Sequence, residues 1–329
     1  MPSRFPAGNP FLSPRSSPLH PPPTYSIDIH PCFFSLPAKQ NRNTARNRNQ
    51  GGRREREGNG RGFNRLLVGE WRRGSSPASA GARKTTADSA TEEQRRAGPV
   101  VVELFSSQGC GTSTEAEDIA TRLGLGEIVD VPVLVLAFHV DYWDYRGWKD
   151  PFGSSAWTVR QKAYVESMRL DTLYTPQIVV QGRDQCLGNE EGSIAAAVCA
   201  APRFPSPTMQ ATFSKPSPMT LQVALSGPLR SKVDSAGANV MVALYQSGVV
   251  ININKGENKG RLLANDYIVR RLEKLATVKD ISMKKSVSGT ITFTLWEGFN
   301  PVKCGLVIFI QNSSLHISGA QQLAIPDNL

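Results

Sequence analysis

The sequence predicts a chain of three parts: a disordered leader in residues 1–97, an α/β domain in residues 98–201 and a β-rich domain in residues 202–329. Residues 1–100 hold 17 Lys and Arg against 7 Asp and Glu, whereas residues 101–329 hold 21 of each, so the leader carries the whole net charge of +10. Continuous apolar runs then alternate with helical patterns up to residue 201, and short strand-like runs follow.

The leader combines 11 of the 23 prolines with an Asn, Arg and Gly stretch that has almost no apolar side chains. Too little surface can be buried there to offset the entropy of ordering the chain. Three interpretations stay open: an extension without function, an organelle transit peptide, and a tail that contacts nucleic-acid phosphates through its Arg-rich residues 42–61. We expect a cytoplasmic protein, or a plastid or mitochondrial one if the leader is a transit peptide.

Composition excludes several classes of protein. Five cysteines in 329 residues are too few for a disulfide scaffold. The best apolar run, residues 133–138, is far shorter than the roughly 20 residues that a membrane-spanning helix needs. Because the body after residue 100 is neutral, we expect no nucleic-acid partner except through the leader.

Three buried strands are predicted in residues 98–201. Residues 100–105 and 131–139 are near-continuous apolar runs of the kind that is buried on both faces in a parallel sheet. The third strand begins at Pro176, because proline cannot donate to the strand ladder and is tolerated at a strand's entrance. Helical patterns at residues 112–123, 154–168 and 193–201 complete a β-helix-β-helix-β order with a closing helix.

Cys110 stands between the first strand and the first helix. Thr112 and Thr114 each precede a Glu by three residues, which is the pattern of a capping box at a helix start. Unpaired amide groups and the positive end of the helix dipole favour thiolate over thiol at such a position. The alternative is that Cys110 only fills space at a turn.

The segment after the second strand interleaves aromatic side chains with Asp. Open α/β sheets bind ligands at the carboxyl ends of their parallel strands, so this segment is a candidate wall of a substrate groove. The alternative is a lid of rings over the edge of the core. The spacing of His139, Asp141 and Asp144 matches no metal signature, and no metal is expected. The candidate substrate contacts are His139, Asp141, Tyr142, Trp143, Trp148 and Tyr174.

Residues 202–329 are predicted to form an antiparallel, sandwich-like unit entered through a Pro-rich linker or edge strand. Residues 265–275 carry an apolar stripe at helical spacing and are expected to form a helix. The polar loop 254–261 is expected to be a solvated hairpin connection, with anion binding as the alternative. Cys304 is expected in the core. Strand-like runs occur at residues 209–213, 219–225, 239–245, 249–253, 290–295 and 306–310.

Three long motifs carry a resemblance to a known family: VVELFSSQGC, FHVDYWDYRGWKDPF and YTPQIVVQGR, in that order. Over about residues 99–325 the chain resembles the thioredoxin-like family catalogued as domain of unknown function 1223. The resemblance implies a thioredoxin-like mixed sheet with flanking helices, places Cys110 at the redox-motif position and makes Pro176 the cis-proline facing it. Many members have Cys-x-x-Cys here, whereas Ser113 replaces the second cysteine. Only monothiol, Cys-x-x-Ser chemistry then remains, unless Cys186 or Cys199 acts as a distant resolving thiol.

We therefore expect redox or thiol-exchange activity at Cys110. In this hypothesis Ser113 and the helix amides stabilise the thiolate, and the backbone of Thr175 and Pro176 aligns a cysteine-containing peptide or glutathione. The Cys110 sulfur should face a cis Pro176 across an open groove. Glutathione would be a co-substrate, and no bound cofactor is expected. The competing hypothesis is a module without chemistry that recognises a peptide or small ligand through the aromatic loop 142–152.

Overall fold

The structure is a computed structural model that describes residues 97–233, 235–279 and 286–329. Nearly all of the predicted leader lies outside the described residues. The helices are α2 (Ser113–Gly124), α3 (Ser155–Met168) and α4 (Glu191–Ala200), with the 3-10 turns η1 (Asp144–Arg146) and η2 (Pro301–Lys303). The strands are β1 (Val100–Ser106), β2 (Val133–His139), β3 (Gln177–Val180), β4 (Asp184–Leu187), β5 (Gln210–Ser217), β6 (Thr220–Pro228), β7 (Ala238–Gln246), β8 (Val249–Asn252), β9 (Leu262–Asn265), β10 (Ile268–Val278), β11 (Ser286–Thr294), β12 (Cys304–Asn312) and β13 (Ile317–Ala324).

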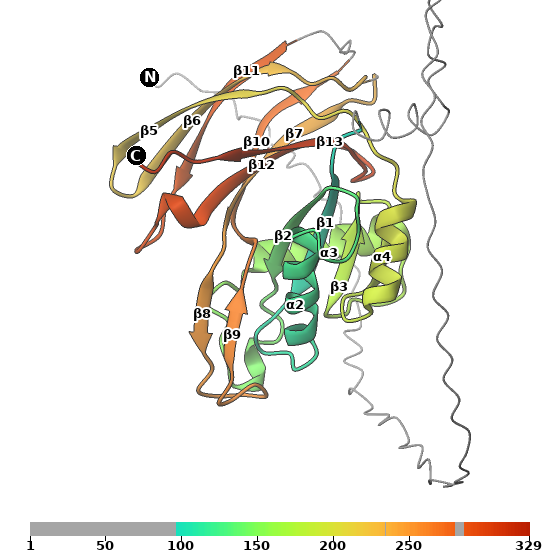
Figure 1. Ribbon diagram of the computed structural model, residues 1–329, viewed down its shortest axis with the longest axis vertical. Helices are drawn as coiled ribbons and strands as arrows, with labels where there is room; N and C mark the ends of the chain where they lie inside the picture. Colours follow the sequence, from blue (N-terminus) through green and yellow to red (C-terminus); the bar gives the residue numbers. More distant parts are fainter. Residues whose placement is uncertain (1–96, 234, 280–285) are drawn as a thin grey trace, which may run out of the picture. The chain divides into compact units, whose positions relative to one another are not determined.

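A mixed sheet of eight strands forms the centre of the described chain, in the order β13-β12-β7-β10-β2-β1-β3-β4 (Figure 1). β1 and β2 are parallel, with Val100 opposite Val133, and β3 runs antiparallel to β1. All seven residues of β1 are buried, because helices cover both faces of the sheet at this point. The three strands predicted between residues 98 and 201 are therefore confirmed, and the protein has a mixed α/β architecture.

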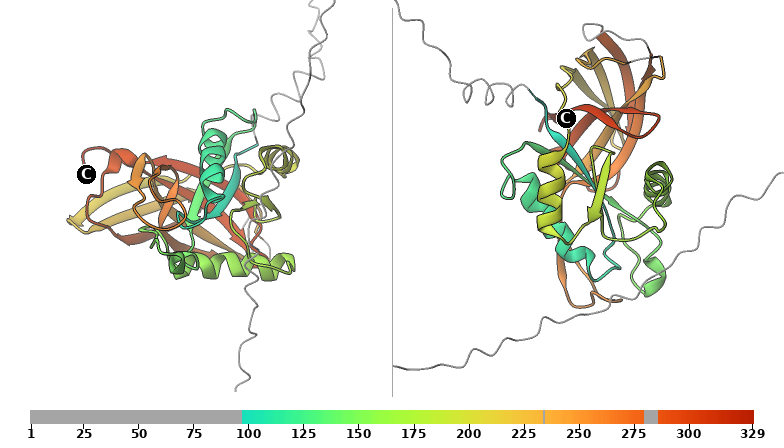
Figure 2. Two further views of the ribbon diagram at one scale, coloured as in Figure 1. Left: turned by 90° about the horizontal axis from the view of Figure 1, so that it is seen from below. Right: turned by 90° about the vertical axis from the view of Figure 1, so that its right-hand side faces the viewer.

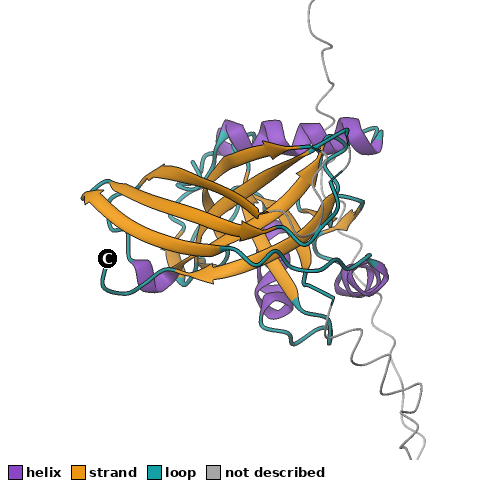
Figure 3. Cartoon of the chain, turned by 90° about the horizontal axis from the view of Figure 1, so that it is seen from above, coloured by secondary structure: helices purple, strands orange, loops and turns teal. Residues whose placement is uncertain are grey.

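Helices lie on both faces of this sheet (Figure 3), and the sequence colours of Figure 2 place α3 on one face and α2 and α4 on the other. Alternate residues of β1 point to opposite faces. Phe105 accordingly packs in one cluster with Trp157 and Tyr164 of α3, whereas Leu104 packs in another with Ala116 of α2. Among the described residues, no helix is both long enough and apolar enough to cross a membrane.

Strands of the C-terminal half extend the same sheet. β10 lies next to β2, with Ile268 opposite Ala137, so hydrogen bonds of one sheet cross the predicted boundary between residues 201 and 202. A second, antiparallel sheet has the order β11-β6-β5. Figure 2 shows this sheet lying against the C-terminal strands of the large sheet. Leu221 and Phe293 share a core cluster with Leu306 of β12.

The prediction of a helix over residues 265–275 is wrong, because this segment forms a strand. β10 pairs with β7 from Ile268 opposite Gln246 to Val278 opposite Ala238. Its register shifts twice, between Val269 and Arg271 and between Lys274 and Ala276. A bulge adds a residue to one strand and breaks the two-residue alternation, so the apolar positions of β10 imitate helical spacing.

Three further strands were not predicted: β4, β9 and β13. β4 and β13 form the two edges of the large sheet, and four-residue β4 has no fully buried residue. An edge strand needs less apolar surface than a central one, and this weakens its sequence pattern. β9 pairs with β8 in a separate hairpin that lies beside α2 (Figure 1).

Candidate functional site

Cys110 lies in the turn between β1 and α2, at the predicted strand–helix junction. Its sulfur is 3.2 Å from the Thr112 hydroxyl oxygen and 3.8 Å from the Thr175 carbonyl oxygen. The Thr175–Pro176 bond is cis, as the resemblance implied. The structure therefore brings the cysteine turn against the segment that enters β3.

Thr112 is the hydroxyl residue in contact with the Cys110 sulfur, whereas the hypothesis places Ser113 there. Ser113 is buried, and its hydroxyl oxygen instead accepts a hydrogen bond of 3.4 Å from the amide of Ser107. The capping box expected at Thr112 does not form either. Thr112 is the N-cap residue, but its backbone is helical and its side chain makes no cap hydrogen bond. Its hydroxyl is thus available to contact the sulfur of Cys110.

The prediction of an open groove at Cys110 is wrong for the conformation described. Cys110 is only 1 % exposed, and it belongs to a core cluster that includes Trp143. The loop between β8 and β9 packs on the same turn. Asn258 is 2 % exposed, and its amide group donates to the carbonyl oxygens of Gln108 at 2.8 Å and of Cys110 at 3.1 Å. This loop is a hairpin connection, as predicted, but Asn258 is not solvated.

Two more contacts join the β8–β9 loop to the site. The Glu257 carboxylate lies so close to Gly111 that a Cβ added there would be 2.7 Å from Oε1, and the same carboxylate is 3.6 Å from the Arg146 guanidinium. Gly256 has a φ of +74° and packs against Trp148, where an added Cβ would lie 3.0 Å from the Trp148 Cβ. The cysteine turn and the aromatic loop are therefore both covered by one hairpin from the C-terminal half.

Only some of the substrate contacts predicted in the aromatic loop lie near Cys110. Tyr142 hydrogen-bonds to the Thr175 side chain and donates to Gln161 at 3.3 Å, and burial raises its pKa. Trp143 is buried, whereas Trp148 donates its indole N–H to Gln108 at 3.0 Å. Tyr142, Trp143 and Trp148 therefore pack against neighbouring side chains, and the substrate contacts predicted for them stay predictions.

Asp141 and Tyr174, two other predicted contacts, face partners away from the sulfur. Asp141 accepts a hydrogen bond of 2.6 Å from Thr158 on α3. Tyr174 donates its hydroxyl to Gln185 on β4, and burial raises its pKa to about 12. Neither residue has a hydrogen bond to the cysteine turn among the described contacts.

His139 belongs to a buried polar cluster beside the cysteine turn. Its Nδ1 is 2.8 Å from Asp150 Oδ2 and its Nε2 is 3.4 Å from Glu117 Oε1. Burial alone would lower the pKa of His139, but the charges of Asp150 and Glu117 outweigh it and raise the pKa to about 9. Burial acts against an ionised Asp150 as well, yet His139 and two backbone amides hold the pKa of Asp150 below its usual value. His139 and Asp150 thus form a buried ion pair.

Glu117 completes this cluster from α2. Its Oε1 accepts a hydrogen bond from the Ser106 hydroxyl, and burial raises the pKa of Glu117 despite the opposing charge of His139. Asp150 in turn accepts the Gln108 amide at 2.8 Å, so the cluster is attached to the cysteine turn through Asp150 and to the end of β1 through Glu117. Within the described part of the chain, no group of three or more His, Cys, Asp or Glu side chains is arranged to hold a metal ion.

Sequence reasoning missed four residues of this region: Gln108, Glu117, Asp150 and Asn258. Glu117 was noted only as a capping residue, and Asp150 only as one of several acids in the aromatic loop. Their burial was not visible in the sequence, because each is isolated among polar or mixed neighbours. Asn258 lies 148 residues from the Cys110 that it contacts, and no local pattern reports such a contact.

Comparison with known proteins gives one family. A family model described as protein of unknown function, DUF1223, matches residues 101–311. A crystal structure of a protein from Agrobacterium tumefaciens is similar at 22 % identity and a TM-score of 0.49, covering 69 % of this chain and 94 % of that one. HBP35 of Porphyromonas gingivalis is similar at 14 % identity and a TM-score of 0.48, covering 70 % and 76 %. No curated protein matches the chain.

Proposed function

This chain belongs to the DUF1223 family, and we propose that it is a monothiol exchange protein on a thioredoxin-like scaffold, with Cys110 as its reactive residue. In this proposal the sheet around β1 is the thioredoxin-like part and the C-terminal strands are a sandwich-like unit joined to it. The substrate is a cysteine-containing peptide or glutathione.

One observation carries the proposal: the position of the Cys110 sulfur between the start of α2 and the segment that enters β3. The hydroxyl oxygen of Thr112 lies 3.2 Å from this sulfur, and the carbonyl oxygen of Thr175 lies 3.8 Å from it. The hydroxyl can donate to a thiolate, and the nearby start of α2 adds the positive end of its dipole.

The proposed step is thiol–disulfide exchange with glutathione disulfide as the oxidant. The Cys110 thiol loses its proton to solvent, and the thiolate attacks one sulfur of the disulfide. A bond forms between Cys110 and one glutathionyl sulfur as the original disulfide bond breaks. The other glutathione leaves as a thiolate and takes up a proton. A second glutathione molecule reverses the step, so no resolving cysteine is needed in the chain.

The test compares Cys110 with Cys199, an exposed cysteine of the same chain. The full-length protein is mixed with glutathione disulfide, and peptide mapping by mass spectrometry follows the gain of one glutathionyl group at each cysteine over time. We expect Cys110 to be modified faster than Cys199 in spite of its burial. A Cys110→Ser variant should lose the fast phase, and a Cys199→Ser variant should retain it.

A second candidate function is supported by the 1 % exposure of Cys110. A thiol enclosed in this way fits a binding or structural module that recognises a peptide or small ligand without chemistry. In that case glutathione disulfide should modify Cys199 first in the native protein, and Cys110 should react only under unfolding conditions. The same time course therefore decides between the two candidates.

A further inference from the structure

Arg146 is held beside the cysteine turn with its charge accessible to solvent. Its side chain is 38 % exposed, and its guanidinium lies 4.8 Å from the centre of the Trp143 ring. Stacking on this buried ring orients the long side chain and leaves the N–H donors at the guanidinium edge available to an anion. A hydrogen bond to Tyr145 and the charges of Glu257 and Cys110 raise the pKa of Arg146, so the guanidinium lies within electrostatic range of the sulfur.

A carboxylate of the chain itself occupies the position beside this cation. The Glu257 carboxylate is 3.6 Å from the Arg146 guanidinium, and it lies so close to Gly111 that an added Cβ would be 2.7 Å from Oε1. One carboxylate thus contacts both the cation and the residue that follows Cys110. The Glu257 side chain is 41 % exposed, and an exposed ion pair at this distance is weak. Another carboxylate can therefore replace it at low cost.

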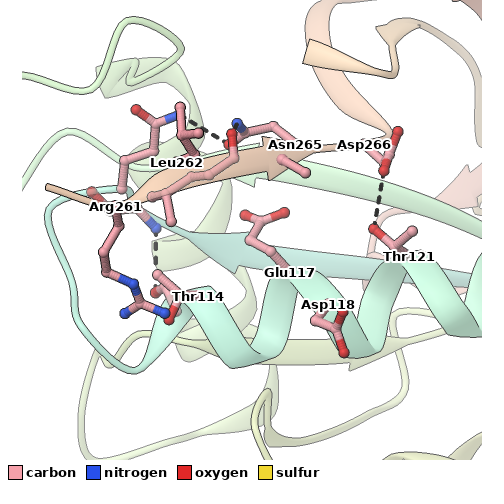
Figure 4. A pocket seen from close by; sticks show the side chains of 13 residues that line it. Thr114, Glu117, Asp118, Thr121, Arg261, Leu262, Asn265 and Asp266 are labelled. Carbon is pink, nitrogen blue, oxygen red and sulfur yellow. Dashed lines mark hydrogen bonds between the residues drawn. The ribbon is translucent and has the colours of Figure 1, made fainter. Parts of the chain in front are cut away.

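The loop that carries Glu257 also covers the cysteine turn. Asn258, the next residue, donates two hydrogen bonds to carbonyl oxygens of that turn. At the base of the hairpin, just after β9, Asp266 accepts a hydrogen bond of 3.2 Å from Thr121 of α2 (Figure 4). The hairpin is thus anchored at its base and at its tip. Release of Glu257 removes one of the contacts that keep the tip over the turn.

The proposed oxidant carries the group that this arrangement selects. Each half of glutathione disulfide has carboxylates at its ends, and a carboxylate binds a guanidinium through two parallel hydrogen bonds. At 3.6 Å, Glu257 is too far from Arg146 for a hydrogen bond, so a free carboxylate gains there what the tethered one lacks. Because the ligand binds Arg146 only after Glu257 has left it, binding shifts the chain toward the state with the released tip.

We infer that Arg146 binds a carboxylate of glutathione disulfide and that Glu257 competes with this carboxylate for the same guanidinium. Arg146 then makes Cys110 prefer an anionic disulfide, and Glu257 helps to keep the β8–β9 loop closed when no substrate is bound. The inference deepens the proposed thiol exchange and rests on it for the identity of the substrate.

The first measurement is the rate at which Cys110 is modified in the full-length protein, followed by peptide mapping. The reagents are glutathione disulfide, which is anionic, and hydroxyethyl disulfide, which is neutral. Each rate is divided by that of Cys199 in the same sample, so the intrinsic reactivities of the reagents cancel. We expect the normalised rate to be about tenfold higher with glutathione disulfide, which is the effect of one charge-assisted contact.

The variants assign this preference to Arg146. Arg146→Gln should remove it, and Glu257→Gln should increase it by about threefold, because a weak competitor is lost. In the Arg146→Gln background, Glu257→Gln should no longer change the preference. Lys149→Gln, which removes a positive charge at an exposed position of the same loop, is the matched control and should leave the preference unchanged. A preference that survives Arg146→Gln, or that Lys149→Gln lowers equally, would overturn the inference and leave the thiol exchange in place.

The second measurement separates recognition from chemistry. S-Methylglutathione keeps the carboxylates but cannot exchange, and its binding is followed by Trp fluorescence because Arg146 lies over Trp143. We expect saturable binding that is about tenfold weaker in Arg146→Gln and about threefold tighter in Glu257→Gln. If these shifts occur while Cys110 stays unreactive, the thiol exchange is overturned and the carboxylate site stands. Absence of saturable binding, or equal affinity in the wild type and Arg146→Gln, would overturn the inference.

Discussion

Replacing Asn258 by Ala is predicted to loosen the cysteine turn from the β8–β9 loop. The Asn258 amide group donates two hydrogen bonds, of 2.8 and 3.1 Å, to the carbonyl oxygens of Gln108 and Cys110. All three residues are at most 3 % exposed, so water cannot readily replace the lost donors. The change removes both bonds and leaves the backbone of the turn intact.

The magnitude follows from the burial of the two carbonyl groups. Leaving one buried polar group without its partner costs about 1–3 kcal/mol, so two such groups give an expected loss of about 2–6 kcal/mol in the free energy of unfolding. Asn254 is an exposed residue of the same loop, and Asn254→Ala should change stability by less than about 0.5 kcal/mol.

The measurement is urea unfolding followed by Trp fluorescence for the wild type and both variants. Alkylation of Cys110 under native conditions is measured alongside, and it should be faster in Asn258→Ala because the turn opens more easily. Equal unfolding free energies for Asn258→Ala and Asn254→Ala would show that the loop does not hold the turn, and the reasoning would be refuted.

Three further predictions concern the rest of the described chain. Glu103→Gln should destabilise the protein by about 3–5 kcal/mol in urea unfolding, because Glu103 is fully buried and pairs with Arg160 at 2.6 Å. A Glu103→Leu, Arg160→Met double variant should recover part of this loss. A double variant less stable than Glu103→Gln would contradict the explanation. The pKa of His139 is raised from 6.5 to about 9, so its contribution to stability is complete below about pH 6.5 and is lost as the pH rises through 9. The unfolding free energy should therefore decline between pH 6.5 and 9, and this decline should be smaller in His139→Gln. An unchanged decline in the variant would show that other groups cause it. Gly188→Ala should destabilise the protein by about 1–3 kcal/mol, because the added Cβ would lie 2.9 Å from the Pro176 Cβ and 3.2 Å from the Ala116 Cβ. Gly192→Ala on α4 is the control, because an added Cβ there would meet no atom within 4 Å beyond its own helix backbone and chain neighbours, and it should be neutral or stabilising in thermal unfolding.

The central elements were predictable because each is specified locally. The Val-rich run of β1 is buried on both faces, and α2 ends at Gly124 with Gly126 at a φ of +78°, as the glycines predicted. The position of Cys110 between them follows from the same two elements. The sequence was misleading where a strand departs from regular alternation, as in β10, whose two bulges imitate a helical pattern.

The sequence by itself determined where Cys110 lies along the chain, which strands are buried, and that the basic charge belongs to the leader, because these properties depend on neighbouring residues. Only the tertiary structure decided what surrounds the sulfur. Burial of Cys110 depends on packing in the core, and the two bonds from Asn258 join residues 150 and 148 positions apart. The pairing of His139 with Asp150 and Glu117 likewise requires β2, α2 and the aromatic loop to be assembled. Contacts between residues so far apart in the sequence depend on how the elements pack, and the local composition of the chain does not encode them.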